Sequence, residues 1–210
     1  MLSIKDLSFG YGQQRLFSNL NLQLEPGLHW LSGANGSGKS SLLRIVAALN
    51  HASQGSIHFR QHQVGSAAYQ ALVSISADAV CPLQDNTVEG ILQLVARCRG
   101  IPMEPLLLHA KAFMLQPLLR QNVAVLSLGQ QKKLSLTLAL AAKPQLLLLD
   151  EPFNALDPES LVYCCAQLQE ARQQGALVLI ASHLSPQSFQ LKLDQHLELK
   201  AGGHLSVVPL

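Results

Sequence analysis

The sequence contains few charged side chains and few aromatic ones. Charged residues make up 13% of the 210 residues and aromatic residues 5%, whereas 48% are hydrophobic. The formal net charge is +2, and Lys and Arg form no long run. This composition excludes a disordered chain, and it leaves no basic patch of the kind that binds nucleic acid or an anionic membrane.

Long apolar runs and paired cysteines are also missing. No uninterrupted apolar stretch approaches the roughly 20 residues that span a bilayer, and no basic segment leads into an apolar region at the N-terminus. The four cysteines have no C-x-x-C or zinc-ligand spacing; they are Cys81, Cys98, Cys164 and Cys165. We therefore expect a soluble intracellular protein whose cysteines are reduced.

The pattern of apolar residues predicts alternating strands and helices in one domain, residues 1–210. We expect strands at residues 2–11, 16–27, 28–32, 55–60, 71–76, 145–150, 176–182, 196–200 and 204–208. We expect helices at residues 40–50, 86–100, 102–115, 127–143 and 158–175. Three of these helices follow one another, which predicts a helical insert over about 85–143 in an otherwise alternating chain.

The stretch "GANGSGKSS" follows a predicted strand and precedes a predicted helix. It matches G-x-x-x-x-G-K-[ST], in which glycines bring backbone N–H groups close to phosphate oxygens. Lys39 would reach the β- and γ-phosphates, and the Ser40 hydroxyl would bind Mg²⁺. The alternative is a glycine-rich turn that binds nothing. The candidate ATP-binding residues are Gly33, Ala34, Asn35, Gly36, Ser37, Gly38, Lys39, Ser40 and Ser41.

Two carboxylates follow the apolar run "LLLL". A buried strand that ends in this way delivers both to the carboxyl edge of a sheet, where ligands bind in open α/β folds. Asp150 would hold Mg²⁺, and Glu151 would orient or deprotonate the attacking water. A solvated acidic pair at a strand end is the alternative.

With these motifs, the chain resembles the nucleotide-binding subunits of ABC transporters. Tyr11 stands where the family has an aromatic residue that stacks on adenine, and "LSLGQ" (126–130) resembles the signature loop. "NALD" (154–157) resembles the D-loop, and His183 matches the switch histidine. The resemblance implies a P-loop NTPase (RecA-like) α/β core with an N-terminal antiparallel β subdomain and an inserted helical subdomain.

The resemblance also implies that one chain holds half of each hydrolytic site. Ser127, Gly129 and Gln130 would form an anion site at a helix N-terminus, used against the γ-phosphate bound to a second nucleotide-binding domain. A homodimer would therefore enclose the ATP. His183 would contact the γ-phosphate, and Asp157 is a candidate N-cap that can also serve the dimer interface.

The chain departs from the family at one position. The family usually has a glutamine at the end of the strand before the helical insert, where it contacts Mg²⁺ and the attacking water. Here the expected position falls near Asp78, and Gln84 comes several residues later. Asp78 is a candidate Mg²⁺ ligand as an oxygen donor.

The sequence is therefore interpreted as an ATPase that powers transport through a separate transmembrane permease. It would be cytoplasmic, peripheral on the inner face of the cell membrane, and would dock through its helical insert. The signature region is similar to that of export-type members, among them the ATPases of cytochrome c biogenesis. The alternatives are a soluble ABC ATPase in DNA repair, chromosome maintenance or translation, and a nucleotide sensor without turnover.

Overall fold

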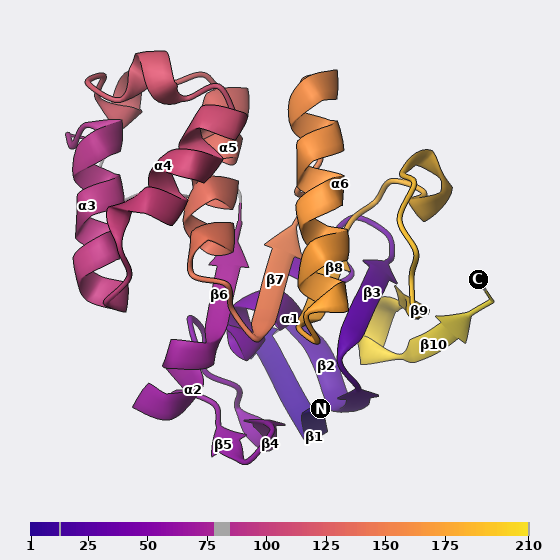
Figure 1. The fold of residues 1–210 in the computed structure, drawn as a ribbon. Helices are drawn as coiled ribbons and strands as arrows, with labels where there is room; N and C mark the ends of the chain where they lie inside the picture. Colours follow the sequence, from indigo (N-terminus) through magenta and orange to yellow (C-terminus); the bar gives the residue numbers. More distant parts are fainter. Residues whose placement is uncertain (13, 78–84, 210) are drawn as a thin grey trace.

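The computed structural model describes residues 1–12, 14–77 and 85–209. Its elements alternate much as the sequence predicts. The strands are β1 (Leu2–Tyr11), β2 (Gln14–Leu24), β3 (Gly27–Ser32), β4 (Gln54–Phe59), β5 (His62–Gln63), β6 (Val73–Ser76), β7 (Leu146–Asp150), β8 (Leu177–Ala181), β9 (Gln195–Leu199) and β10 (Leu205–Val208). The α-helices are α1 (Lys39–Val46), α2 (Ala67–Leu72), α3 (Val88–Arg99), α4 (Met103–Ala112), α5 (Leu128–Ala141) and α6 (Pro158–Gln173). Figure 1 shows their arrangement.

The first sheet is antiparallel, in the order β2-β1-β4-β5. The inner strand β1 alternates apolar and polar residues. Its pairing register places these apolar residues opposite apolar residues of β2 and β4. Leu2 lies opposite Leu24 on β2 and Phe59 on β4, and all three are buried. This sheet therefore covers one side of the second sheet with an apolar face.

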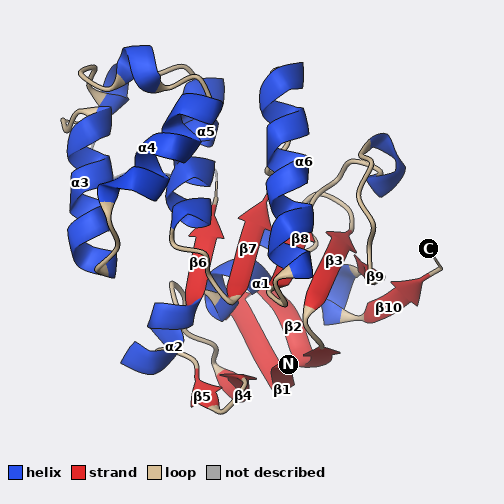
Figure 2. Ribbon diagram, in the orientation of Figure 1, coloured by secondary structure: helices blue, strands red, loops and turns tan. Residues whose placement is uncertain are grey.

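The second sheet has the order β10-β9-β3-β8-β7-β6, and all its strands except β10 run parallel. Strand β7 is buried on both faces, which explains its run of four leucines. Leu147 and Leu149 pack in the core under the helices α3 to α6, whereas Leu146 and Leu148 pack in the core with α1 and the antiparallel sheet. Figure 2 shows the parallel strands flanked by helices.

Helices α3, α4 and α5 lie between β6 and β7 in the chain and are grouped beyond the end of β6 in Figure 1. Thr87 caps α3 by accepting a hydrogen bond from the backbone N–H of Gly90, and Gly100 ends the helix with φ of 64°. Thr87 and Gly100 therefore fix the two ends of α3. Among the residues that the structure describes, every helix is too short or too polar to cross a bilayer.

One predicted strand begins too early. We expected a strand from Ala71, but Ala71 and Leu72 end the short helix α2. The Ser66 side chain caps this helix by accepting a hydrogen bond from the Tyr69 N–H, and the Tyr69 ring is buried. Apolar periodicity alone did not reveal this turn of helix. The residues proposed to replace the usual glutamine, Asp78 and Gln84, lie outside the described residues.

Candidate functional site

The glycine loop connects β3 to α1 and needs its glycines for steric reasons. Gly33 has φ of 154°, and a Cβ there would lie 2.4 Å from the carbonyl oxygen of Leu199. Gly38 has φ of 102°, and a Cβ there would lie 2.7 Å from the Phe17 ring. At both positions the backbone conformation and the close neighbours exclude a side chain. The two glycines therefore fix the backbone conformation of the loop.

Lys39 closes this loop from within. Its ammonium group donates hydrogen bonds to the carbonyl oxygens of Gly33, at 2.8 Å, and Ala34, at 3.3 Å. The Ser37 N–H donates to the same Ala34 oxygen at 3.1 Å. The lysine is 7% exposed, so its ammonium group lies buried against the backbone of the loop. A buried cation beside the N-terminus of α1 provides the field that attracts a phosphate.

Tyr11 lies at the end of β1, close to the helix that follows the loop. Its hydroxyl accepts a hydrogen bond from the Asn50 side chain at 3.0 Å and lies 3.5 Å from the Ser41 hydroxyl. The ring packs edge-on against Phe9, with 4.9 Å between the centroids, and is 52% exposed. It thus presents an aromatic surface beside the phosphate loop.

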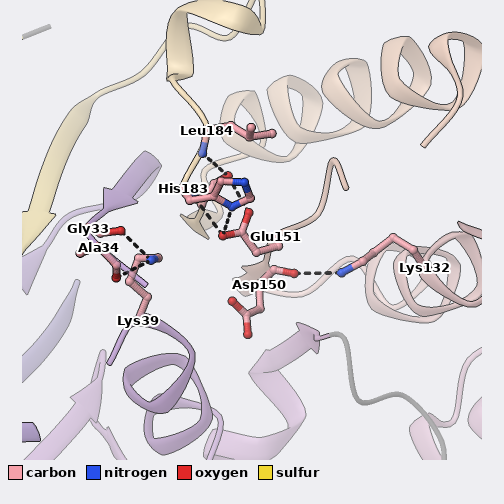
Figure 3. Close-up of polar contacts among 9 residues, drawn as sticks. Gly33, Ala34, Lys39, Lys132, Asp150, Glu151, His183 and Leu184 are labelled. Carbon is pink, nitrogen blue, oxygen red and sulfur yellow. Dashed lines mark hydrogen bonds and ion pairs between the residues drawn. The ribbon is translucent and has the colours of Figure 1, made fainter. Parts of the chain in front are cut away.

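The two carboxylates after β7 lie in different environments. Asp150 is buried, with 4% of its surface exposed. At Glu151 the backbone turns, with a positive φ of 46° that is uncommon for a residue with a side chain. This backbone turn separates the two side chains. In Figure 3 the Glu151 carboxylate turns toward His183 and the Asp150 carboxylate turns away from it.

Three hydrogen bonds fix the Glu151 carboxylate. One oxygen accepts from the His183 backbone N–H at 2.9 Å and pairs with the His183 ring Nδ1 at 2.8 Å. The other accepts from the Ser182 hydroxyl at 2.8 Å. Because a carboxylate accepts but does not donate, the Nδ1 atom of His183 carries a proton in this contact. The strand end of β8 therefore orients both the carboxylate and the imidazole.

The helix α5 begins at the signature-like sequence with a complete capping box. The Gln130 N–H donates to the Ser127 hydroxyl at 3.3 Å, and the Ser127 N–H donates to the Gln130 side chain at 2.9 Å. Val125 and Leu128 beside this cap are exposed. Ser127 and Gln130 therefore bond to each other, and the helix start presents apolar side chains to solvent.

Three residues on one face of α5 contact the last residue of β7 or the chain that follows it. Gly129 approaches the Ala155 carbonyl so closely that a Cβ would lie 2.6 Å from its oxygen. Lys132 donates a hydrogen bond to the Asp150 carbonyl oxygen at 3.0 Å, and Lys133 forms an ion pair with Asp157. The spacing of i, i+3 and i+4 places these three residues on one side of the helix.

Asp157 has a second role in the structure. Its carboxylate caps α6 by accepting hydrogen bonds from the Ser160 N–H and hydroxyl, both at 3.0 Å. The hydrogen bond from Lys133 is the main cause that lowers the pKa of Asp157 below its usual range. The predicted N-cap is confirmed, and the cap also ties α5 to α6.

The structure brings Lys39, Asp150, Glu151 and His183 together at the carboxyl edge of the parallel sheet, because β3, β8 and β7 are neighbours (Figure 3). It places Ser127, Gly129 and Gln130 at the start of α5. Sequence reasoning gave no role to Ser182, Lys132 or Lys133. The two lysines could have been found, because a helix of buried leucines that carries adjacent lysines requires polar partners for them.

Comparison with known proteins gives one consistent result. Residues 17–154 match the family model described as ABC transporter. The cytochrome c biogenesis ATP-binding export protein CcmA of Cupriavidus necator is 33% identical over 202 residues, covering 92% of this chain and 88% of that protein. The ABC-type transporter ATP-binding protein EcsA of Bacillus subtilis is 30% identical, covering 88% and 77%.

Solved structures show the same fold. A structure described as the ATP-binding subunit of an ABC transporter superposes with a TM-score of 0.87 at 23% identity, covering 99% of this chain and 90% of that one. The dimeric structure of the bacterial ABC transporter cassette MJ0796 superposes with a TM-score of 0.83 at 20% identity, covering both chains fully.

Proposed function

This chain belongs to the ABC transporter family as an ATP-binding and ATP-hydrolysing subunit, and from that premise we propose how its residues bind and hydrolyse the nucleotide. Tyr11 stacks on the adenine base, and the loop 33–41 encloses the phosphates. Lys39 neutralises the β- and γ-phosphates from the mouth of the loop. The observation that carries this proposal is the location of the Lys39 ammonium and the Glu151 carboxylate at one edge of the sheet (Figure 3).

The residues around the loop fit a magnesium ion. Ser40 lies in the first turn of α1, and Asp150 offers a buried carboxylate at the end of β7. Mg²⁺ takes oxygen ligands and is usually held by one or two protein groups together with substrate phosphates. We therefore assign Ser40 and Asp150 as its protein ligands. When bound, the ion neutralises charge on the phosphates.

Glu151 is positioned to accept a hydrogen bond from the attacking water. A carboxylate has about four lone-pair sites, and the three hydrogen bonds from Ser182 and His183 leave room for a further donor. Those same bonds prevent the side chain from rotating away. His183 is held through Nδ1, so its Nε2 lies on the side of the ring away from the Glu151 carboxylate. Hydrolysis is then promoted mainly by positioning and electrostatic stabilisation.

We propose that the active form is a homodimer in which α5 of one copy faces the ATP held by the other. The capped N-terminus of α5 offers positive potential, and the exposed apolar residues Val125 and Leu128 beside it suit burial against a partner. The dimeric structure of the cassette MJ0796 is consistent with this arrangement.

Replacement of Glu151 by Gln tests the catalytic proposal. The amide keeps the size of the side chain but removes its ability to take a proton, so steady-state ATP hydrolysis should fall about 10²- to 10⁴-fold. ATP binding should persist, and the ATP-bound dimer should accumulate in size-exclusion chromatography. The matched control is Glu159→Gln in the first turn of α6. Unchanged hydrolysis by Glu151→Gln would remove Glu151 from this role.

The membrane partner is proposed to dock where the helices 85–143 meet the core. A groove of about 520 Å³ lies there, lined by residues of α2, α3 and β6 and by the turn after α1. Arg99 of α3 spans it by donating hydrogen bonds to the carbonyl oxygens of Gln70 and Val73, and Leu49 is exposed at its edge. The groove therefore has an exposed apolar residue at its edge and lies between the helices 85–143 and the rest of the chain.

Transport is favoured over a soluble role because the relatives described above are transport proteins by name. We propose an export-type complex at the inner face of the cell membrane. A Leu49→Asp variant should lose most of its copurification with a multi-spanning protein from membranes, while ATP hydrolysis by the isolated subunit stays within twofold. Recovery of nucleic acid or ribosomes with the unmodified chain would instead favour the soluble alternative.

A further inference from the structure

The peptide group between Asp150 and Glu151 is held from both sides. Its N–H donates a hydrogen bond to the Ala181 carbonyl oxygen of β8 at 2.8 Å. Its carbonyl oxygen accepts a hydrogen bond from the Lys132 ammonium of α5 at 3.0 Å. In a trans peptide these two groups point in opposite directions, so the two bonds fix the plane of the peptide.

Strand pairing explains why the Asp150 carbonyl oxygen takes its hydrogen bond from a side chain. Asp150 is the last residue of β7 that pairs with β8, opposite Ala181. On the other side, the pairing of β6 with β7 extends, within residues 1–12, 14–77 and 85–209, to Ser76 and Leu149. The Asp150 carbonyl therefore lies beyond the β6 pairing, and Lys132 supplies its donor from a helix.

The plane of this peptide determines where the next side chain points. Glu151 has φ of 46°, a conformation that costs on the order of 1 kcal/mol or more for a residue with a Cβ and that persists only when its surroundings hold it. Rotation of the Asp150–Glu151 peptide would change φ of Glu151 directly. Unless ψ of Asp150 changes in the opposite sense, this rotation moves the Glu151 carboxylate away from Ser182 and His183.

Lys132 is also a costly residue to place at this position. It is 6% exposed, and an ammonium removed from water requires hydrogen-bond partners, whereas a leucine would fit the apolar neighbourhood of α5 without that requirement. Figure 3 shows its side chain reaching from α5 to the Asp150 carbonyl. The cost points to a specific role for the charge.

We propose that Lys132 is a positioning residue for ATP hydrolysis, which holds the Asp150–Glu151 peptide so that the Glu151 carboxylate stays in its reactive orientation. The proposal rests on the role assigned to Glu151 above. Because Lys132 lies on the helix that Ser127 caps, the peptide is linked mechanically to the end of α5 that is proposed to face the partner's ATP.

The test compares Lys132→Met, Lys132→Gln and Lys132→Arg with the exposed-lysine control Lys111→Met. Lys132→Met should lower kcat about tenfold or more, because small displacements of a catalytic group have effects of this size, while KM for ATP stays within about twofold. Lys132→Arg keeps a charged donor and should recover much of kcat. Lys132→Gln provides a second neutral variant if the methionine variant does not fold.

A double-mutant comparison separates an effect through Glu151 from other effects. If Lys132 acts through that carboxylate, Lys132→Met should have little further effect on single-turnover hydrolysis once Glu151→Gln is present. An unchanged kcat in the folded neutral variants would overturn the inference, as would an equal loss in the Glu151→Gln background. If Glu151→Gln itself hydrolyses ATP normally, the assigned role of Glu151 fails first.

Discussion

The phosphate loop and the catalytic end of β7 are built in different ways. The loop 33–41 is continuous in sequence, and its lysine bonds to carbonyl groups only five and six residues away. The end of β7 is held by β8 and α5, through Ser182, His183 and Lys132. A binding element can thus be local, whereas the orientation of a reactive group depends on contacts between distant segments.

The largest effect is expected from breaking the local element. Replacing Lys39 with Ala removes the cation at the mouth of the loop and its bonds to the Gly33 and Ala34 carbonyls. ATP affinity should fall at least tenfold, and hydrolysis should become undetectable. Titration with a fluorescent ATP analogue measures the affinity, with Lys111→Met as the control. Affinity within threefold of the unmodified protein would contradict the role of Lys39.

A smaller effect is expected from widening the contact between α5 and the chain after β7. Gly129→Ala places a methyl group where it would lie 2.6 Å from the Ala155 oxygen, a backbone atom that cannot rotate away. The helix start must shift, and kcat should fall about tenfold with little change in ATP binding by the monomer.

The matched control for this variant is Gly90→Ala in α3, where the nearest atom is the Thr87 side-chain oxygen at 3.2 Å. Its hydrolysis should remain normal. If Gly129→Ala also hydrolyses ATP normally, the close approach of α5 to Ala155 is not needed for function.

The smallest effect is expected at Asp157, and it concerns stability. Asp157→Ala removes the cap of α6 and the partner of Lys133, and should lower the free energy of unfolding by about 1 to 2 kcal/mol in urea denaturation. The pKa of Asp157 is lower in the folded protein than in the unfolded chain. The stability that its charge contributes is therefore complete above the ordinary pKa of an aspartate, and it is lost as the pH falls through the folded-state pKa. The difference between the two proteins should therefore shrink below about pH 4; a constant difference would contradict the ionic contribution.

The difference between the local phosphate loop and the end of β7, which distant segments hold, also explains what the sequence could predict. The glycine loop, the paired carboxylates and the cap at Asp157 depend on short motifs, and their positions at the ends of strands and helices were predicted correctly. The positive φ of Glu151 and its bonds depend on β8, which lies about thirty residues later, and no local pattern encodes them. The turn of helix α2 was missed because its apolar side chains do not repeat over enough residues.

The most direct test of the account is an ATP-dependent cross-link between two copies of the chain. Asn35 of the phosphate loop and Leu128 at the start of α5 are both exposed, so each accepts a cysteine. The variants Asn35→Cys and Leu128→Cys, both in a Glu151→Gln and Cys98→Ser background, carry different tags and are mixed. We predict a cross-link between the two tagged chains that forms with Mg–ATP and not without nucleotide. A cross-link that is absent, or that forms equally without ATP, would contradict a site shared between two copies.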